Sequence, residues 1–190
     1  MTRTNPKLSK SEKTRQAILE AAQKLFYERG FDGASVRQIA QEVPIDPAMI
    51  MRYFGSKEGL FSAAVTIDLK LPDPKTIPPD KAGAALVAHF LNLWEGDRSA
   101  IGLPILLRSA VSNQDASDKI HAIFAKQVAP TIAGITSADD ADTRAGLIVS
   151  QLFGLALCRY ILKLPPLVDM TQDEIISRIG PVVQGHLWRD

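Results

Sequence analysis

Hydrophobic residues recur every three or four positions near the start of the chain, with polar residues between them. From Lys13 to Gly30 they lie on one face of a helix of 3.6 residues per turn, at Ile18, Ala21, Ala22, Leu25 and Phe26. Ser9 and Glu12 have the spacing of a capping box, which predicts a helix start, and Gly30 suits a helix end.

The next helix is predicted to be short. Ser35 and Gln38 repeat the capping-box pattern, and the helix that they open should end near Glu42. Pro44 cannot continue this helix, because proline lacks a backbone N–H and keeps the preceding residue out of the helical region.

A second short helix follows at once. Asp46 and Pro47 have the pattern of an N-cap followed by proline at the first helical position, and they predict a helix to about Phe54. A long helix followed by two short helices around a tight turn is the helix-turn-helix arrangement. In that motif the last helix enters the major groove of DNA and reads base edges.

A fourth helix, capped by Ser56, is predicted from Lys57 to about Leu69. No helix can continue beyond it, because prolines crowd the next segment, at Pro72, Pro74, Pro78 and Pro79. We therefore expect three parts: an arm and helix-turn-helix domain over 1–56, a connecting helix over 57–70, and a C-terminal domain over 71–190.

The remainder of the chain also has helical periodicity, with helices expected over 80–95, 99–112, 115–134, 139–163 and 171–188. The sequence shows no alternation of strand period and no hairpin signal. The predicted fold is therefore all-α, with about nine helices.

The small net charge of +1 conceals an uneven distribution. Residues 1–60 hold 10 basic and 7 acidic side chains, whereas the rest hold 12 and 14. The excess lies in the first 15 residues, which hold Arg3, Lys7, Lys10, Lys13 and Arg15 against Glu12. A basic arm favours a polyanionic partner, and the alternative is a solvated polar tail.

Residues 14–61 resemble the DNA-binding domain of TetR-family (tetracycline-repressor-like) transcriptional regulators. The resemblance is carried by Ala21-Ala22 before Leu25-Phe26, by the break at Gly30-Phe31, and by Tyr53-Phe54-Gly55-Ser56-Lys57-Glu58-Gly59-Leu60. It implies three DNA-binding helices, a connecting fourth helix and a larger C-terminal domain for ligand binding and dimerisation. It also implies a homodimer, and repression as the usual mode.

The predicted DNA contacts come from the arm and the two short helices: Lys13, Arg15, Ser35, Arg37, Gln38, Ala48, Met49, Met51, Arg52, Tyr53 and Lys57. Two positions depart from the family pattern, since Pro44 stands where a glycine is usual and Met51 where a tyrosine is common. Because the start of the reading helix has few hydrogen-bond donors, we expect modest base readout assisted by DNA shape.

Phosphate contacts are expected from Ser35, Tyr53 and Lys57, with salt-dependent affinity from the arm. Each prediction has a structural alternative. Tyr53 can pack against the start of the fourth helix, Lys57 can be a solvated helix start, and Arg52 can form a salt bridge within the domain.

The C-terminal half is expected to hold a cavity for a hydrophobic small molecule. The candidate lining residues are Phe90, Trp94, Leu107, His121, Phe124, Gln151 and Cys158. The alternative for each is ordinary core packing, and His89 and His121 can equally lie on polar helix faces.

The helices over 139–163 and 171–188 are the predicted dimer interface, because the first is apolar around most of its circumference. Gly146, Ser150 and Gly154 form a strip of small residues that permits close approach. A two-fold dimer through a four-helix bundle would require a palindromic operator.

Other classes of protein find little support. One cysteine fits a reducing cytoplasm, three scattered histidines form no metal-ligand pattern, and no phosphate-binding loop is present, so we expect neither an enzyme nor a cofactor. The longest apolar stretch, from Gly146 to Cys158, is short for a membrane span, and no secretory signal is expected. The open alternative is a helical adaptor that does not read DNA sequence.

Overall fold

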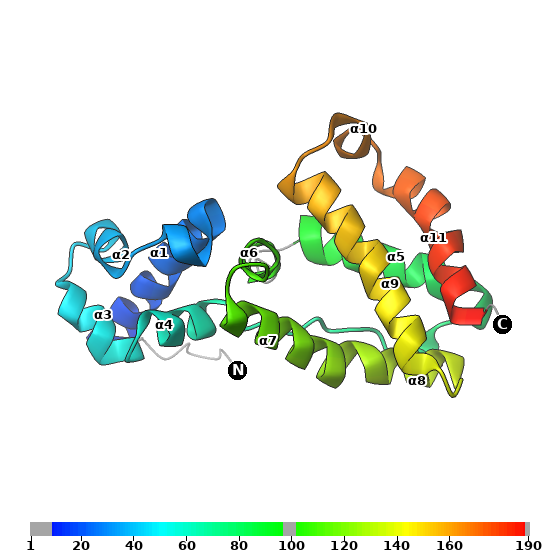
Figure 1. The fold of residues 1–190 in the computed structure, drawn as a ribbon, viewed down its shortest axis with the longest axis horizontal. Helices are drawn as coiled ribbons and strands as arrows, with labels where there is room; N and C mark the ends of the chain where they lie inside the picture. Colours follow the sequence, from blue (N-terminus) through cyan, green and yellow to red (C-terminus); the bar gives the residue numbers. More distant parts are fainter. Residues whose placement is uncertain (1–8, 97–101, 189–190) are drawn as a thin grey trace, which may run out of the picture.

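The computed structural model describes residues 9–96 and 102–188. Within them all regular structure is helical, which confirms the predicted all-α class. The α-helices are α1 (Lys10–Gly33), α2 (Val36–Glu42), α3 (Pro47–Phe54), α4 (Lys57–Ala64), α5 (Ala82–Glu95), α6 (Gly102–Ser109), α7 (Gln114–Ile123), α8 (Ala129–Thr136), α9 (Ala141–Ala156), α10 (Pro165–Val168) and α11 (Gln172–Trp188). Figure 1 shows α1–α4 at one end of an elongated molecule and α5, α8, α9 and α11 at the other.

The first four helices begin where the capping residues predict. The N-caps are Ser9, Ser35, Asp46 and Ser56. Both predicted capping boxes form completely, because each cap side chain accepts from a backbone N–H while its partner three residues later accepts from the cap. Local hydrogen bonding therefore sets these helix starts.

Three positions in this region take positive φ. Gly30 interrupts α1 with φ of 69°, and Gly55 ends α3 with φ of 77°. Pro44 has φ of 22°, so the backbone leaves the range near −65° that a proline ring prefers. Ile45 N–H donates to the Ala40 carbonyl at 3.1 Å and closes the turn between α2 and α3.

The predicted connecting helix is too long. α4 ends at Ala64 rather than near Leu69, and the chain continues without helix to the 3₁₀ turn Pro74–Thr76. Val65, Thr66 and Ile67 come next, and a run of β-branched residues loses side-chain freedom in a helix. The domain limits proposed from the sequence remain predictions.

In the C-terminal half the helices agree with prediction within a few residues, with more internal structure. The segment predicted as one helix over 115–134 consists of α7, a π-helical turn (Phe124–Val128) and α8. A second π-helical turn (Leu157–Ile161) extends α9. The start of the helix predicted over 99–112 lies outside the described residues.

Two hydrophobic cores hold the molecule together. The first joins α1–α4 to α6 and the start of α7, with Phe26, Phe31 and Phe61 in mutual ring contact. The second joins α5, α8, α9 and α11. α6 therefore belongs to the core of the helix-turn-helix end although it lies in the C-terminal half of the sequence.

Among the described residues one helix, Ala141–Ile161, reaches the length and mean hydropathy (1.2) of a membrane span. This helix is longer than the apolar stretch from Gly146 to Cys158, because it includes the flanking residues 141–145 and 159–161, among them Asp142, Arg144 and Arg159. Ala145, Ile148 and Leu155 of this helix are buried in the second core, so it packs as part of the bundle.

Candidate nucleic-acid interface and effector cavity

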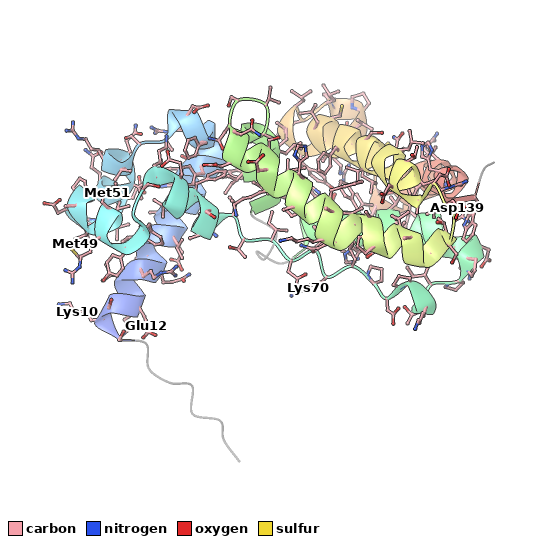
Figure 2. The ribbon with its side chains drawn as sticks, turned by 60° about the horizontal axis from the view of Figure 1, so that its bottom comes forward. Lys10, Glu12, Met49, Met51, Lys70 and Asp139 are labelled. Carbon is pink, nitrogen blue, oxygen red and sulfur yellow. The ribbon has the colours of Figure 1, made fainter. Side chains whose placement is uncertain are left out.

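α3 presents its outer face to solvent at one tip of the molecule. Ile50 is fully buried and anchors the helix, whereas Ala48 and Arg52 are exposed and Met51 is 43% exposed. Met49 is half-buried. Figure 2 shows Met49 and Met51 at this tip, near the end of α1 that carries Lys10 and Glu12. The geometry suits insertion of α3 into a groove.

The side chains at the C-terminal end of α3 contact α1. The Tyr53 hydroxyl and the Ser11 hydroxyl are 3.0 Å apart, and the Arg15 guanidinium lies 5.1 Å from the centre of the Phe54 ring. These contacts bring the arm-proximal end of α1 beside the reading helix. Sequence reasoning missed Ser11, because no local pattern marks a partner 42 residues away.

Several predicted phosphate ligands already have partners. The Ser35 hydroxyl donates to Gln38 Oε1 at 2.9 Å, as part of the α2 capping box. The Lys57 ammonium is half-buried and lies 4.2 Å from the centre of the Phe31 ring, a cation–π geometry.

The other predicted cations of this surface point to solvent. Lys13, Arg37 and Arg52 are exposed. Ion pairs among the residues that the structure describes do not include Arg52, so the salt bridge considered as its alternative role is not formed there. These three side chains are available to an anionic partner.

Two adjacent cavities lie in the C-terminal half. The larger, of about 290 Å³, is lined by α5, α6, α7, α9, the first π-helical turn and Leu69. The smaller, of about 90 Å³, lies between α5, α8 and α9. They share lining side chains, namely Leu69, Trp94, Leu103, Val128, Val149 and Phe153.

Five of the seven predicted lining residues face these cavities: Phe90, Trp94, Leu107, His121 and Phe124. Gln151 and Cys158 lie outside the lining of both. Their positions on α9 and its π-helical extension turn away from the enclosed space, a rotation that periodicity alone does not specify. Sequence reasoning also missed Leu69, which precedes every helix predicted for the C-terminal domain.

The cavity walls are almost entirely apolar. Of the described lining side chains, only His89, Trp94, His121 and Thr131 carry polar atoms, and none of them is a carboxylate, lysine or arginine. His89 Nε2 lies 2.8 Å from the Leu69 carbonyl oxygen, and the Thr131 hydroxyl donates to the Gln127 carbonyl at 2.8 Å. A charged ligand would lose hydration there without gaining a charged partner, so the walls favour an uncharged lipophilic molecule.

A polar network fixes one wall of the cavities. Glu95 accepts hydrogen bonds from the Tyr160 hydroxyl (2.7 Å), Arg159 Nε (2.9 Å) and Gln172 Nε2 (2.8 Å). Tyr160 in turn stacks on Trp94 with ring centres 4.8 Å apart. Burial raises the pKa of Glu95, but the three hydrogen bonds outweigh it and hold that pKa below its usual value.

Most of the large hydrophobic side chains that are exposed to solvent lie on α9, on α11 and on the segment that connects them. Leu147, Leu157, Val182 and Trp188 are each more than 40% exposed. A Cβ added at Gly154 would meet no heavy atom within 4 Å. This face is therefore open in the single chain.

An exposed reading helix on a three-helix unit, joined to a larger helical domain with an apolar cavity, defines a helix-turn-helix regulator of transcription. Comparison with known proteins specifies the family. The model for bacterial regulatory proteins of the tetR family matches residues 18–64, and the model for the tetracyclin repressor-like C-terminal domain matches residues 80–187. The chain belongs to the TetR family.

Relatives agree with this assignment. The chain is 41% identical over 59 residues to the HTH-type transcriptional repressor NicS of Pseudomonas putida, covering 31% of this chain and 28% of NicS. It is 39% identical over 59 residues to the repressor AcnR of Corynebacterium glutamicum, covering 31% of each. The match thus spans less than a third of these curated relatives.

Solved structures match over nearly the whole chain. A TetR-family regulator from Streptomyces coelicolor superposes with a TM-score of 0.63 at 27% identity, covering 97% of this chain and 99% of that one. NalD of Pseudomonas aeruginosa, the secondary repressor of a multidrug efflux pump, superposes with a TM-score of 0.64 at 20% identity. This match covers 95% of this chain and 99% of NalD. TetR-family proteins are DNA-binding regulators rather than enzymes. Membership of this family therefore supports a DNA-binding regulator over the helical adaptor considered as the alternative.

Proposed function

We propose that this protein is a ligand-responsive repressor of the cytoplasm, which binds a palindromic operator as a homodimer and is released by an uncharged lipophilic molecule. The observation that carries the proposal is the pairing of a solvent-facing α3 with an apolar cavity in one chain. Repression, rather than activation, is supported by the relatives NicS and AcnR, which are named as transcriptional repressors.

The proposed operator contacts divide by chemistry. Arg37 and Arg52 supply charged donors to bases and phosphates, and Met51 with Ala48 supplies apolar contact to thymine methyl groups. Tyr53, held beside Ser11, contributes a hydroxyl to the phosphate backbone. Lys57 must leave the Phe31 ring or reach past it to touch a phosphate.

The proposed dimer uses the open face of α9 and α11. Exposed leucine side chains on α9 and its π-helical extension and exposed Val182 on α11, with no side chain at Gly154, permit close packing against a second copy in a four-helix bundle with two-fold symmetry. The two reading helices would then contact half-sites about one helical turn of DNA apart.

The first experiment is selection of bound duplexes from a random pool at fixed salt concentration, read by sequencing. We expect enrichment of a two-fold palindrome. Arg52→Ala should lose discrimination at one position of each half-site, whereas Arg108→Ala, an exposed arginine on α6 beside Tyr27, should select the same sequence. Binding that is salt-sensitive but selects no sequence would contradict specific repression.

The effector class is tested by thermal unfolding with two fluorescent probes of similar size. Uncharged N-phenyl-1-naphthylamine should raise the melting temperature, because a ligand of the native state stabilises it. Its sulfonated relative 1-anilinonaphthalene-8-sulfonate should have less effect at equal concentration. A larger rise with the sulfonate would contradict the uncharged ligand class.

A further inference from the structure

A single residue of the segment after α4 is held by side chains from two directions. The Leu69 N–H donates to Gln127 Oε1 at 2.8 Å, and the Leu69 carbonyl lies 2.8 Å from His89 Nε2. Gln127 Nε2 also donates to the Ile67 carbonyl at 3.2 Å. We call residues 65–71 the strap; Figure 2 labels Lys70 on it, where the chain passes from the helix-turn-helix end to the bundle.

The side chain of the same residue is a wall of both cavities. Leu69 is 8% exposed and lines the larger and the smaller cavity. Its backbone therefore belongs to the strap that leads to α4, while its side chain occupies the boundary of the proposed effector site. A molecule that fills the cavities must contact or displace this side chain.

The holding residues come from elements that also form the cavities. Gln127 lies in the π-helical turn between α7 and α8, and such turns are frequent at functional sites. His89 lies on α5 and lines the smaller cavity. A change in cavity shape can therefore move the strap in two ways: through the side chain of Leu69, and through the hydrogen bonds from the Gln127 and His89 side chains to the strap backbone.

We propose that Leu69 senses the effector, and that Gln127 and His89 are positioning residues that hold the strap in the DNA-binding arrangement. The inference rests on the proposed function, since it describes how cavity and operator sites communicate. An effector that binds better when the strap is released lowers operator affinity, and by linkage release of the strap raises effector affinity.

This reciprocity distinguishes a coupling role from a structural one. In full-length Gln127→Ala protein, which lacks the amide that bonds Leu69 and Ile67, we expect operator affinity to fall about tenfold without any ligand. Affinity for N-phenyl-1-naphthylamine should rise. A variant that was merely misfolded would lose both affinities.

The experiment measures operator binding by fluorescence anisotropy and probe binding by fluorescence enhancement, on the same preparations. Gln114→Ala is the matched control, because Gln114 is an exposed glutamine on α7 whose side chain bonds Asp118 and which lies outside both cavities and the proposed dimer face, and it should behave like the wild type. Leu69→Ala should still bind the probe, but saturating probe should then change operator affinity less than twofold.

The outcomes separate the two proposals. If the wild type does not bind the probe, the proposed ligand class fails, and the operator affinity of Gln127→Ala still tests the strap. If Gln127→Ala binds operator within twofold of the wild type, the positioning role is overturned. If Leu69→Ala keeps the full response to probe, the sensing role is overturned.

Discussion

The junction of α3 and α4 depends on the absence of a side chain at Gly59. A Cβ at this position would lie 2.1 Å from the Phe54 carbonyl oxygen and 3.3 Å from its carbonyl carbon. Carbon–oxygen contacts of about 3.3 Å or more are normal, so Gly59→Ala must separate α4 from the end of the reading helix by about 1 Å.

The size of the effect follows from two opposing contributions. Overpacking costs about 1–3 kcal/mol, whereas replacing a helical glycine by alanine gains up to about 1 kcal/mol. Because the obstructing atom belongs to the backbone and cannot rotate away, the overpacking cost should lie in the upper part of its range, at about 3 kcal/mol. We expect a net loss of about 2 kcal/mol in the free energy of unfolding.

The assay is thermal unfolding at one fixed protein concentration, because the stability of an oligomer depends on concentration. Gly59→Ala should lower the melting temperature by about 4–8 °C for a chain of this size. It should also weaken operator binding about tenfold or more, because the displaced end belongs to α3.

The control is Ser62→Ala, which places the same alanine side chain at an exposed position of the same helix, α4. This variant should unfold at the wild-type temperature or slightly above it. If Gly59→Ala also unfolds at or above the wild-type temperature, the steric reasoning is refuted.

Three further predictions concern binding, pH and assembly. Tyr53→Phe should change the free energy of unfolding by less than about 0.5 kcal/mol, since its hydroxyl is bonded at the surface, while weakening operator binding measurably in anisotropy titrations. Glu95→Gln should cost about 1–2 kcal/mol at pH 7 in urea unfolding by weakening the bond to Arg159. Because the folded pKa of Glu95 is lowered, its contribution is present above the unfolded pKa near 4.5 and is lost as pH falls through the folded pKa, so variant and wild type should converge in acid. Gly154→Leu should yield monomers in light scattering, whereas the same side chain at exposed Ala122 should leave the dimer intact, and a dimeric Gly154→Leu protein would exclude this interface.

Much of the helix-turn-helix end could be predicted from residues close together in sequence. Ser35 and Gln38 cap α2, and Asp46 with Pro47 starts α3, because each device uses hydrogen bonds or backbone restrictions within a few residues. The periodic apolar positions, with Ile50 fully buried, likewise indicate which helix face is covered. The family motif at the end of α3 lies in this same region.

The cavity walls were only partly predictable. Phe90, Trp94 and Phe124 line the enclosed space, but so does Leu69, which lies outside every helix. Cys158, on the π-helical extension of α9, does not. Periodicity shows that a residue is turned inward, but it does not show whether the interior is packed or hollow at that point.

The sequence by itself determined where the helices of the DNA-binding end begin, since capping and proline act locally. The end of α4, the strap and its bond to Gln127 were decided only by the tertiary structure. Leu69 and Gln127 are 58 positions apart, and their hydrogen bond exists because packing of α5, α8 and α9 brings the π-helical turn against the strap. Hydrogen bonds of that range depend on the relative placement of whole helices, which no local pattern specifies.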